Sequence, residues 1–119
     1  MKIIFKLLCL SIVFISCDKE MGIHGVIVDS DTGLRVSDVK AKMISQQGDR
    51  ETTSRTNGYF ATIIVFNCGI ASCNDDFSVE FVKEGYKNKV ITESYYESSE
   101  AEFVNPDKKD TVIIKLEKL

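Results

Sequence analysis

The chain has 119 residues, of which 15 are Lys or Arg and 18 are Asp or Glu, so its formal net charge is −3. A chain of this length can bury one hydrophobic core but not two, and we expect a single domain. The acidic balance argues against nucleic-acid binding, which needs a basic face to displace counterions from phosphates.

The first 16 residues have the composition of an export signal. Lys2 and Lys6 give a positive start, and the run from Leu7 to Ile15 is apolar apart from Ser11. This run is roughly half of the ~20 apolar residues that a membrane-spanning helix needs. An ordinary secretory signal would end in an Ala-x-Ala-like cleavage site, and the sequence has none there.

The residues around Cys17 resemble the lipobox of a bacterial lipoprotein signal. In Phe14-Ile15-Ser16-Cys17 a small residue directly precedes the cysteine, and Asp18-Lys19-Glu20 then turns polar; Phe14 stands where that family usually has Leu. The resemblance implies cleavage after residue 16, acylation (palmitate included) of Cys17, and a lipid-anchored protein of the cell envelope. We expect the outer membrane rather than the inner one. A plain secreted protein and a retained anchor are the alternatives.

Cleavage there would leave 103 residues with 13 basic and 18 acidic side chains. We expect residues 17–21 to form a lipidated tether and residues 22–119 to form the folded domain. Cys68 and Cys73 would be the remaining thiols. An even pair of thiols in an oxidising compartment predicts a disulfide bond between them.

Period-two alternation, interrupted by turn residues, predicts about seven short strands and no convincing amphipathic helix. In the first strand apolar residues occupy both faces, as in a strand covered on both sides. Residues 93–109 are acidic and contain Pro106, and we expect a loop there. The pattern is typical of an all-β sandwich. The expected strands are 23–28, 39–43, 51–55, 59–66, 77–82, 90–92 and 111–116.

The alternation also assigns twelve side chains to the core. They are Ile23, Ile27, Val39, Ala41, Phe60, Ile64, Phe77, Val79, Phe81, Ile91, Val112 and Ile114.

Four motifs follow one another along the chain: Ile23-x-Gly25-x-Ile27-x-Asp29 with Thr32-Gly33, then Val36 and Val39, then Thr56-Asn57-Gly58-Tyr59-Phe60, then Phe77-x-Val79 with Lys83-Glu84-Gly85-Tyr86. Together they resemble the carboxypeptidase regulatory-like domain over roughly residues 22–117. That family has a transthyretin-like (prealbumin-like) fold, so the resemblance implies a seven-stranded Greek-key β-sandwich.

The shared residues also have physical roles that we can predict. Gly25 in a strand permits either close approach of a neighbouring backbone or a bulge. Asn57-Gly58 suits a turn with positive φ at both central positions. We expect the ring of Tyr86 to pack on the end of the sandwich and its hydroxyl to face water.

His24 is the only histidine, so one chain cannot assemble a multi-histidine metal site, and any Ser-His-Asp triad would depend on this residue. Some transthyretin-like folds are enzymes. Hydroxyisourate hydrolase ends in Tyr-Arg-Gly-Ser, whereas this chain ends in Glu117-Lys118-Leu119. Intradiol dioxygenases bind iron through two His and two Tyr, which one His cannot supply. We expect no enzymatic activity and no cofactor.

Acidic residues cluster in three turns, and we predict no metal site from them. Asp29-x-Asp31-x-Gly33 resembles the start of a calcium loop, but its glycine comes one place early and its twelfth position is Lys40. A plain turn explains it better. Asn74-Asp75-Asp76, and Asp107 with Asp110, could contact a hard cation, yet carboxylates without a defined cage are more often solvated.

The aromatic residues of the expected loop, Tyr95, Tyr96 and Phe103, are the candidate binding surface, because exposed aromatic rings can anchor partners. The alternative is that one ring closes the end of the sandwich and another lies flat on the surface.

The sequence therefore favours a lipid-anchored, non-enzymatic envelope protein acting as an accessory or binding module, with a protein or carbohydrate partner. One alternative is a structural lipoprotein component of an envelope or secretion machine. A small hydrolase is disfavoured for want of a recognisable pair of nucleophile and base.

Overall fold

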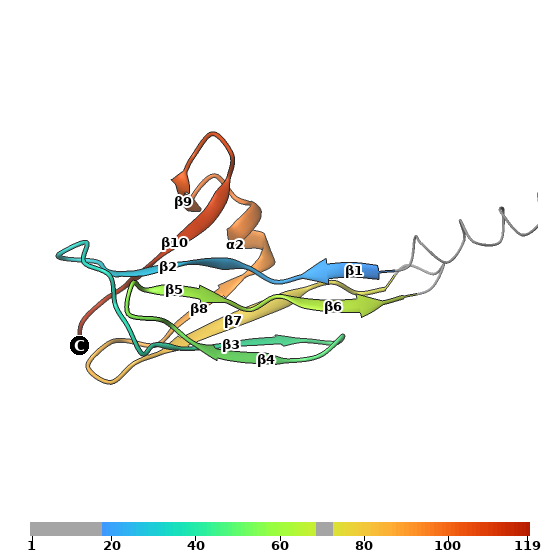
Figure 1. Ribbon diagram of the computed structural model, residues 1–119, viewed down its shortest axis with the longest axis horizontal. Helices are drawn as coiled ribbons and strands as arrows, with labels where there is room; N and C mark the ends of the chain where they lie inside the picture. Colours follow the sequence, from blue (N-terminus) through green and yellow to red (C-terminus); the bar gives the residue numbers. More distant parts are fainter. Residues whose placement is uncertain (1–17, 69–72) are drawn as a thin grey trace, which may run out of the picture.

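The computed structural model describes residues 18–68 and 73–119; Cys17 and the expected signal peptide, residues 1–16, lie outside them. Two four-stranded sheets and a two-stranded ribbon make up the described chain (Figure 1). The expected all-β fold is confirmed. The strands are β1 (Asp18–Met21), β2 (His24–Asp29), β3 (Lys40–Ser45), β4 (Arg50–Thr53), β5 (Tyr59–Ala61), β6 (Ile64–Asn67), β7 (Phe77–Val82), β8 (Lys89–Thr92), β9 (Glu102–Asn105) and β10 (Asp110–Leu116), and the helix is α2 (Glu93–Glu97).

The first sheet has the strand order β5-β2-β10-β9 and is held together by a parallel pair at its centre. There β2 runs parallel to β10, with Gly25 opposite Val112 and Ile27 opposite Ile114. A Cβ atom on Gly25 would overlap the carbonyl oxygen of Val112. The expected close approach of a neighbouring backbone at Gly25 is therefore confirmed.

The second sheet has the order β4-β3-β7-β8 and is antiparallel throughout. Its two central strands, β3 and β7, alternate between buried and exposed side chains, because one face packs on the first sheet and the other meets solvent. In β7, for example, Val79 and Phe81 are buried whereas Glu80 is exposed.

The core lies between the two sheets, and ten of the twelve predicted core side chains are buried in it. Ile64 and Phe77 are the exceptions; both are half-buried and pack against its edge. The rings of Phe60 and Phe81 meet edge to face with centroids 5.1 Å apart, which joins the two sheets at the centre. Further buried side chains are Met21, Val36, Met43 and Leu116.

Residues 18–21 are part of the fold and not the polar tether that we expected. They form β1, which pairs antiparallel with β6 from Asp18 opposite Asn67 to Met21 opposite Ile64. Met21 is buried, with 5% of its surface exposed. The sequence of this segment is too polar to predict a strand. It forms one because its backbone pairs with β6.

The described chain contains ten strands where we expected seven, for three reasons. The first is β1. The second is that the expected strand 59–66 is split, since its first half pairs with β2 and its second half with β1. Thr62 lies at the change of partner and bonds the carbonyl of Ile23 through both its N–H and its hydroxyl. The third is that the expected loop 93–109 contains α2 and β9.

The Asn57-Gly58 turn also differs from expectation. Gly58 has a φ of +78°, but Asn57 is not among the residues with positive φ. Instead the side chain of Asn57 accepts a hydrogen bond from the N–H of Tyr59 at 3.0 Å, and this bond between side chain and backbone stabilises the turn.

Asp29, at the end of β2, joins three separate parts of the chain. Its Oδ1 accepts hydrogen bonds from the N–H groups of Asp31 at 2.8 Å and Thr32 at 3.1 Å, as in an Asx turn. Its Oδ2 accepts a hydrogen bond from the hydroxyl of Tyr86 at 2.9 Å and lies 3.4 Å from Nζ of Lys118. The expectation of a water-facing Tyr86 hydroxyl is therefore wrong, because the Asp29 carboxylate binds it.

These contacts change the pKa of two side chains. The N–H of Thr32 is the main cause that lowers the pKa of Asp29 to about 2, aided by Tyr86, Asp31 and Lys118 and opposed by burial. The hydrogen bond from the Tyr86 hydroxyl to Asp29, followed by burial, raises the pKa of Tyr86.

Within the described residues, no helix combines the length and the apolar character needed to cross a bilayer.

Replacing Phe81 by Ala should lower the free energy of unfolding by about 3 to 5 kcal/mol, since it removes a fully buried ring and leaves a cavity. Val90→Ala, on the neighbouring strand with 57% of its surface exposed, is the control and should change stability by less than about 0.5 kcal/mol. Denaturant melts measure both. Equal losses in the two variants would contradict the assigned register.

Asp29→Asn should make folding stability less sensitive to acid. Because the folded-state pKa of Asp29 is depressed, its contribution is complete above the ordinary value of 3.8 and is lost as pH falls through about 2. The stability gap between wild type and Asp29→Asn should therefore be widest at neutral pH and narrow towards pH 2 in melts at stepped pH. Asp31→Asn removes an exposed carboxylate from the same turn, and its gap should not narrow in this way.

Candidate functional site

Of the three aromatic residues of the expected binding surface, Tyr95 and Tyr96 lie on α2 and Phe103 lies on β9. The helix begins after Thr92, whose hydroxyl accepts from the N–H of Tyr95, and ends before Ser98, whose hydroxyl donates to the carbonyl of Tyr95. The rings of Tyr96 and Phe103 meet at a centroid distance of 5.7 Å and an angle of 72°. Tyr95, Tyr96 and Phe103 are all half-buried and pack against the core.

Phe103 also borders a shallow hollow of about 370 Å³ at the β9 end. The remaining lining residues are Ser98, Ser99, Ala101, Glu102, Pro106 and Lys109. All three rings thus pack against the core while part of their surface stays open. That this surface binds a partner remains a prediction.

Among the residues that the structure describes, His24 pairs with the side chain of Asp110 and with no second polar side chain. Its Nε2 lies 3.2 Å from Oδ1 of Asp110. The centroid of its ring lies 6.2 Å from that of Tyr59, and the two rings are tilted by 52°. Its Nδ1 is buried and has no hydrogen-bond partner among the described residues. A hydrolytic triad would need a hydroxyl on the nitrogen opposite the carboxylate, and His24 contacts none there. Asp110, which we considered beside Asp107 as a cation contact, faces the histidine instead.

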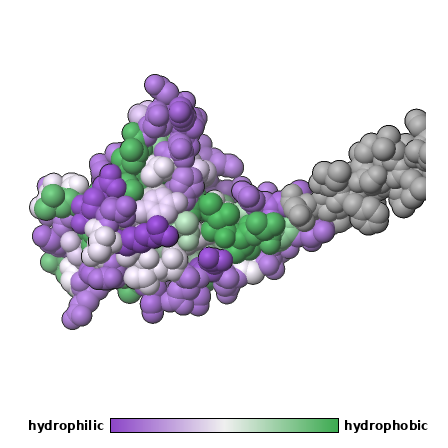
Figure 2. All heavy atoms as spheres, in the orientation of Figure 1, coloured by the Kyte–Doolittle hydropathy of each residue, from purple (hydrophilic) through white to green (hydrophobic). Residues whose placement is uncertain are grey.

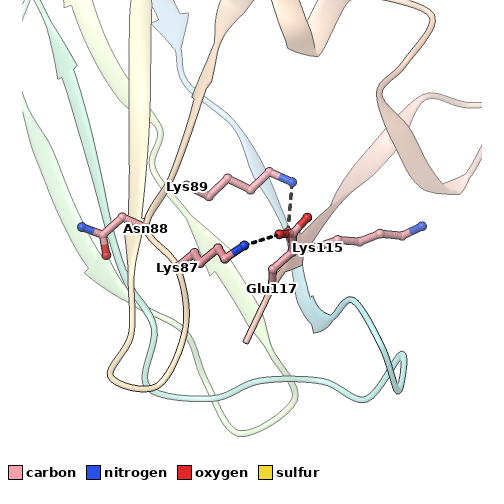
Figure 3. A pocket seen from close by; sticks show the side chains of 5 residues that line it. All are labelled: Lys87, Asn88, Lys89, Lys115 and Glu117. Atoms are coloured by element: carbon pink, nitrogen blue, oxygen red, sulfur yellow. Dashed lines mark hydrogen bonds and ion pairs between the residues drawn. The ribbon is translucent and has the colours of Figure 1, made fainter. Parts of the chain in front are cut away.

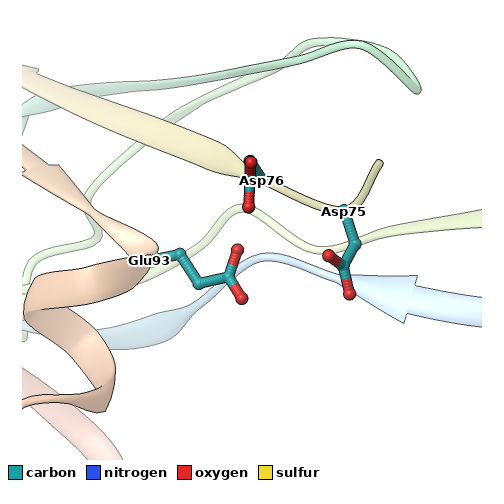
Figure 4. A group of neighbouring side chains, drawn as sticks. All are labelled: Asp75, Asp76 and Glu93. Atoms are coloured by element: carbon teal, nitrogen blue, oxygen red, sulfur yellow. The ribbon is translucent and has the colours of Figure 1, made fainter. Parts of the chain in front are cut away.

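Asp75, Asp76 and Glu93 bring three carboxylates together at the start of β7 and α2 (Figure 4). One oxygen from each lies within 4.8 Å of the others. Burial, followed by the charges of Asp75, Glu97 and Asp76, raises the pKa of Glu93. Oxygen ligands of this kind suit a hard cation such as Ca²⁺, but exposed acidic groups commonly cluster without one. Sequence reasoning considered Asp75 and Asp76 and missed Glu93, because α2 was expected to be loop.

The expected disulfide between Cys68 and Cys73 is present, and their Cα atoms are 5.9 Å apart. Cys68 directly follows β6, and three residues lie between Cys73 and the start of β7. The Nε2 group of Gln47 donates to the carbonyl of Asn74 at 3.0 Å, so the β3–β4 turn contacts the chain directly after the bond. Residues 69–72 of the expected tip lie outside the described part of the chain.

A second hollow, which we name the lysine pocket, lies between β8 and the end of β10 (Figure 3). Its lining residues are Lys87, Asn88, Lys89, Lys115 and Glu117, and its volume is about 220 Å³. Nζ of Lys89 donates to the carbonyl of Lys115 at 2.9 Å, and Nζ of Lys87 lies 3.3 Å from Oε2 of Glu117. Burial lowers the pKa of Lys89.

Sequence reasoning missed the lysine pocket, although one signal for it was available. Lys89 lies opposite Phe81 in the sheet, two residues before the buried Ile91. The alternation that places Ile91 in the core therefore directs Lys89 towards the same face. A lysine in phase with core residues is the pattern that could have drawn attention to this edge.

Comparison with known proteins gives the fold and no family. No family model matches the chain, and no curated protein matches it either. Among solved structures, the chain is similar to 3-chlorocatechol 1,2-dioxygenase from Rhodococcus opacus 1CP, with a TM-score of 0.50 and 16% sequence identity. The match covers 84% of this chain but only 60% of the dioxygenase. At this identity the likeness extends to the β-sandwich fold alone.

Proposed function

We propose that the chain is a lipid-anchored, non-enzymatic binding module of the bacterial cell envelope, with the lipid on Cys17. The observation that carries this proposal is that β1 begins at Asp18, the residue directly after Cys17, and pairs with β6 over its whole length. A lipid at residue 17 would thus join the domain at the end of a paired ribbon. In Figure 1 this end of the ribbon lies opposite the C-terminus.

The surface of the ribbon supports the same orientation. An apolar area lies over the β1–β6 ribbon on the face drawn in Figure 2, where most other side chains are polar. Val65 of β6 has 64% of its surface exposed. Apolar side chains next to an acylated residue would lie where the domain meets the lipid headgroups, with the outer membrane favoured.

The resemblance to the carboxypeptidase regulatory-like domain is also part of this proposal, together with its transthyretin-like Greek-key topology. The seven strands expected from the sequence correspond to β2, β3, β4, the pair β5 and β6, β7, β8 and β10. Gly25 meets the Val112 backbone, and Gly58 and Gly85 adopt positive φ in their turns. These are the positions at which the motif residues would be required.

A binding role fits the described side chains better than catalysis. His24 pairs with Asp110 and contacts no hydroxyl through Nδ1, and one histidine does not provide the two-histidine iron ligation of intradiol dioxygenases. The surface hollows beside Phe103 and Lys89 offer places for a partner or ligand.

Cys17→Ser should abolish acyl labelling and release the protein from the membrane, either as a soluble form or as an uncut precursor. A single acyl chain holds a protein only marginally, so a multiply acylated cysteine would account for durable anchoring. The measurement is membrane fractionation with acyl labelling. Cys9→Ser, within the expected signal, is the matched control and should be labelled as wild type. Unchanged labelling and membrane association of Cys17→Ser would refute the anchor.

A further inference from the structure

We propose that the lysine pocket binds the phosphate group of a ligand. This inference deepens the proposed function, because it rests on the binding role suggested above and names the chemistry of what is bound. It does not depend on the lipid anchor, so each can fail without the other.

Lys89 is the central residue of the proposed site. Its strand position is core-facing, but β8 is the edge of its sheet, and its side chain reaches the open margin between the two sheets. An ammonium group has three donors. The carbonyl of Lys115 accepts one, and no carboxylate among the described residues lies within the 4.0 Å of an ion pair. A half-buried cation with donors to spare and no direct ion-pair partner among the described residues favours an anion.

Lys87 supplies the second cation. Figure 3 shows its ammonium group and that of Lys89 directed towards the same side as Glu117, whereas the side chain of Lys115 extends away from them. Lys115 has its own partner in Glu102, at 3.0 Å. Lys87 and Glu117 are 61% and 66% exposed, and ion pairs so open to water contribute little. The Glu117 carboxylate thus occupies, weakly, the position that an external anion would take.

The cations of the pocket favour phosphate over carboxylate because phosphate carries the larger charge. No arginine, whose planar fork matches carboxylates and phosphates alike, lines this pocket. Lysines act as point charges, a common way to bind phosphate. A phosphate dianion would also attract Lys87 and Lys89 more strongly than the single charge of Glu117 does. The volume of about 220 Å³ admits a phosphate group but not a whole drug-sized ligand, so the rest of the ligand would remain outside.

The position of the pocket indicates which way the ligand approaches. The N–H of Lys87 donates to the carbonyl of Glu117, and that of Leu119 to the carbonyl of Gly85, so the pocket lies beside the C-terminus. Figure 1 shows this end opposite the start of β1. A phosphate-bearing ligand would therefore be met on the side away from the proposed anchor.

The test is a titration of the full-length protein, kept in detergent, with inorganic phosphate, followed through the backbone amide NMR signals of Lys87 and Lys89. We expect saturable shifts in the wild type. In Lys89→Gln the affinity for phosphate should fall about tenfold or more, because one charge-assisted contact is lost. Glu117→Gln removes the competing carboxylate and should tighten binding. Lys40→Gln is the matched control, because this exposed lysine pairs with Glu51 on another strand, and its variant should bind as wild type.

Absence of saturable shifts would overturn the proposal, as would equal weakening in Lys89→Gln and Lys40→Gln, which would indicate diffuse charge attraction. Circular dichroism melts show whether Lys89→Gln is folded. If it is not, Glu117→Gln decides: unchanged or weaker phosphate binding would again refute the site.

A second arm identifies the source of the phosphate. Micelles doped with phosphatidic acid are compared with micelles doped with phosphatidylcholine. Lys89-dependent shifts with inorganic phosphate and with phosphatidic acid, but not with phosphatidylcholine, would support a lipid headgroup as ligand. Shifts with inorganic phosphate but with neither micelle would support a soluble phosphate ester. The Cys17→Ser fractionation addresses the anchor separately, so loss of either result leaves the other intact.

Discussion

The parallel pairing of β2 with β10 is the contact on which the sandwich depends, because it joins strands from opposite ends of the chain at the centre of one sheet. It is possible only because Gly25 carries no Cβ, which would overlap the Val112 carbonyl oxygen. At the end of the pair, Ser30 donates to the carbonyl of Leu116, and Asp29 then binds Tyr86 and Lys118. One strand pair and one carboxylate thus hold together the β2–β3 connection, the β7–β8 turn and the C-terminal residues.

Sequence reasoning succeeded where one face of a strand is dry and the other wet. In β7 the alternation of Val79 and Phe81 with Glu80 identifies both the strand and its register. It failed where pairing alone makes the structure. Three of the four residues of β1 are charged, namely Asp18, Lys19 and Glu20, and the segment becomes a strand only against β6. The helix α2 has five residues, too few to show a helical period.

The candidate sites were harder to foresee than the fold, since each depends on which strands lie side by side. Lys89 and Glu117 line one pocket only because the edge strand β8 of one sheet lies against the end of β10 in the other. No local sequence pattern encodes this arrangement of the sheets. Glu93 likewise meets Asp75 and Asp76 through the start of α2. By contrast, the disulfide was predictable because Cys68 and Cys73 are the two thiols that remain after the expected cleavage and the acylation of Cys17. They also lie close in sequence.

The pairing of β1 with β6 has a mechanical consequence if Cys17 carries the lipid. A pull on the lipid would act at the first residue of β1 and along the strand, roughly perpendicular to the hydrogen bonds that join it to β6. Those bonds would be loaded together, in shear, and not opened one after another as in peeling. The ribbon would then be a stiff connection that transmits tension between the bilayer and the sandwich, and the buried Met21 would fix its end to the core.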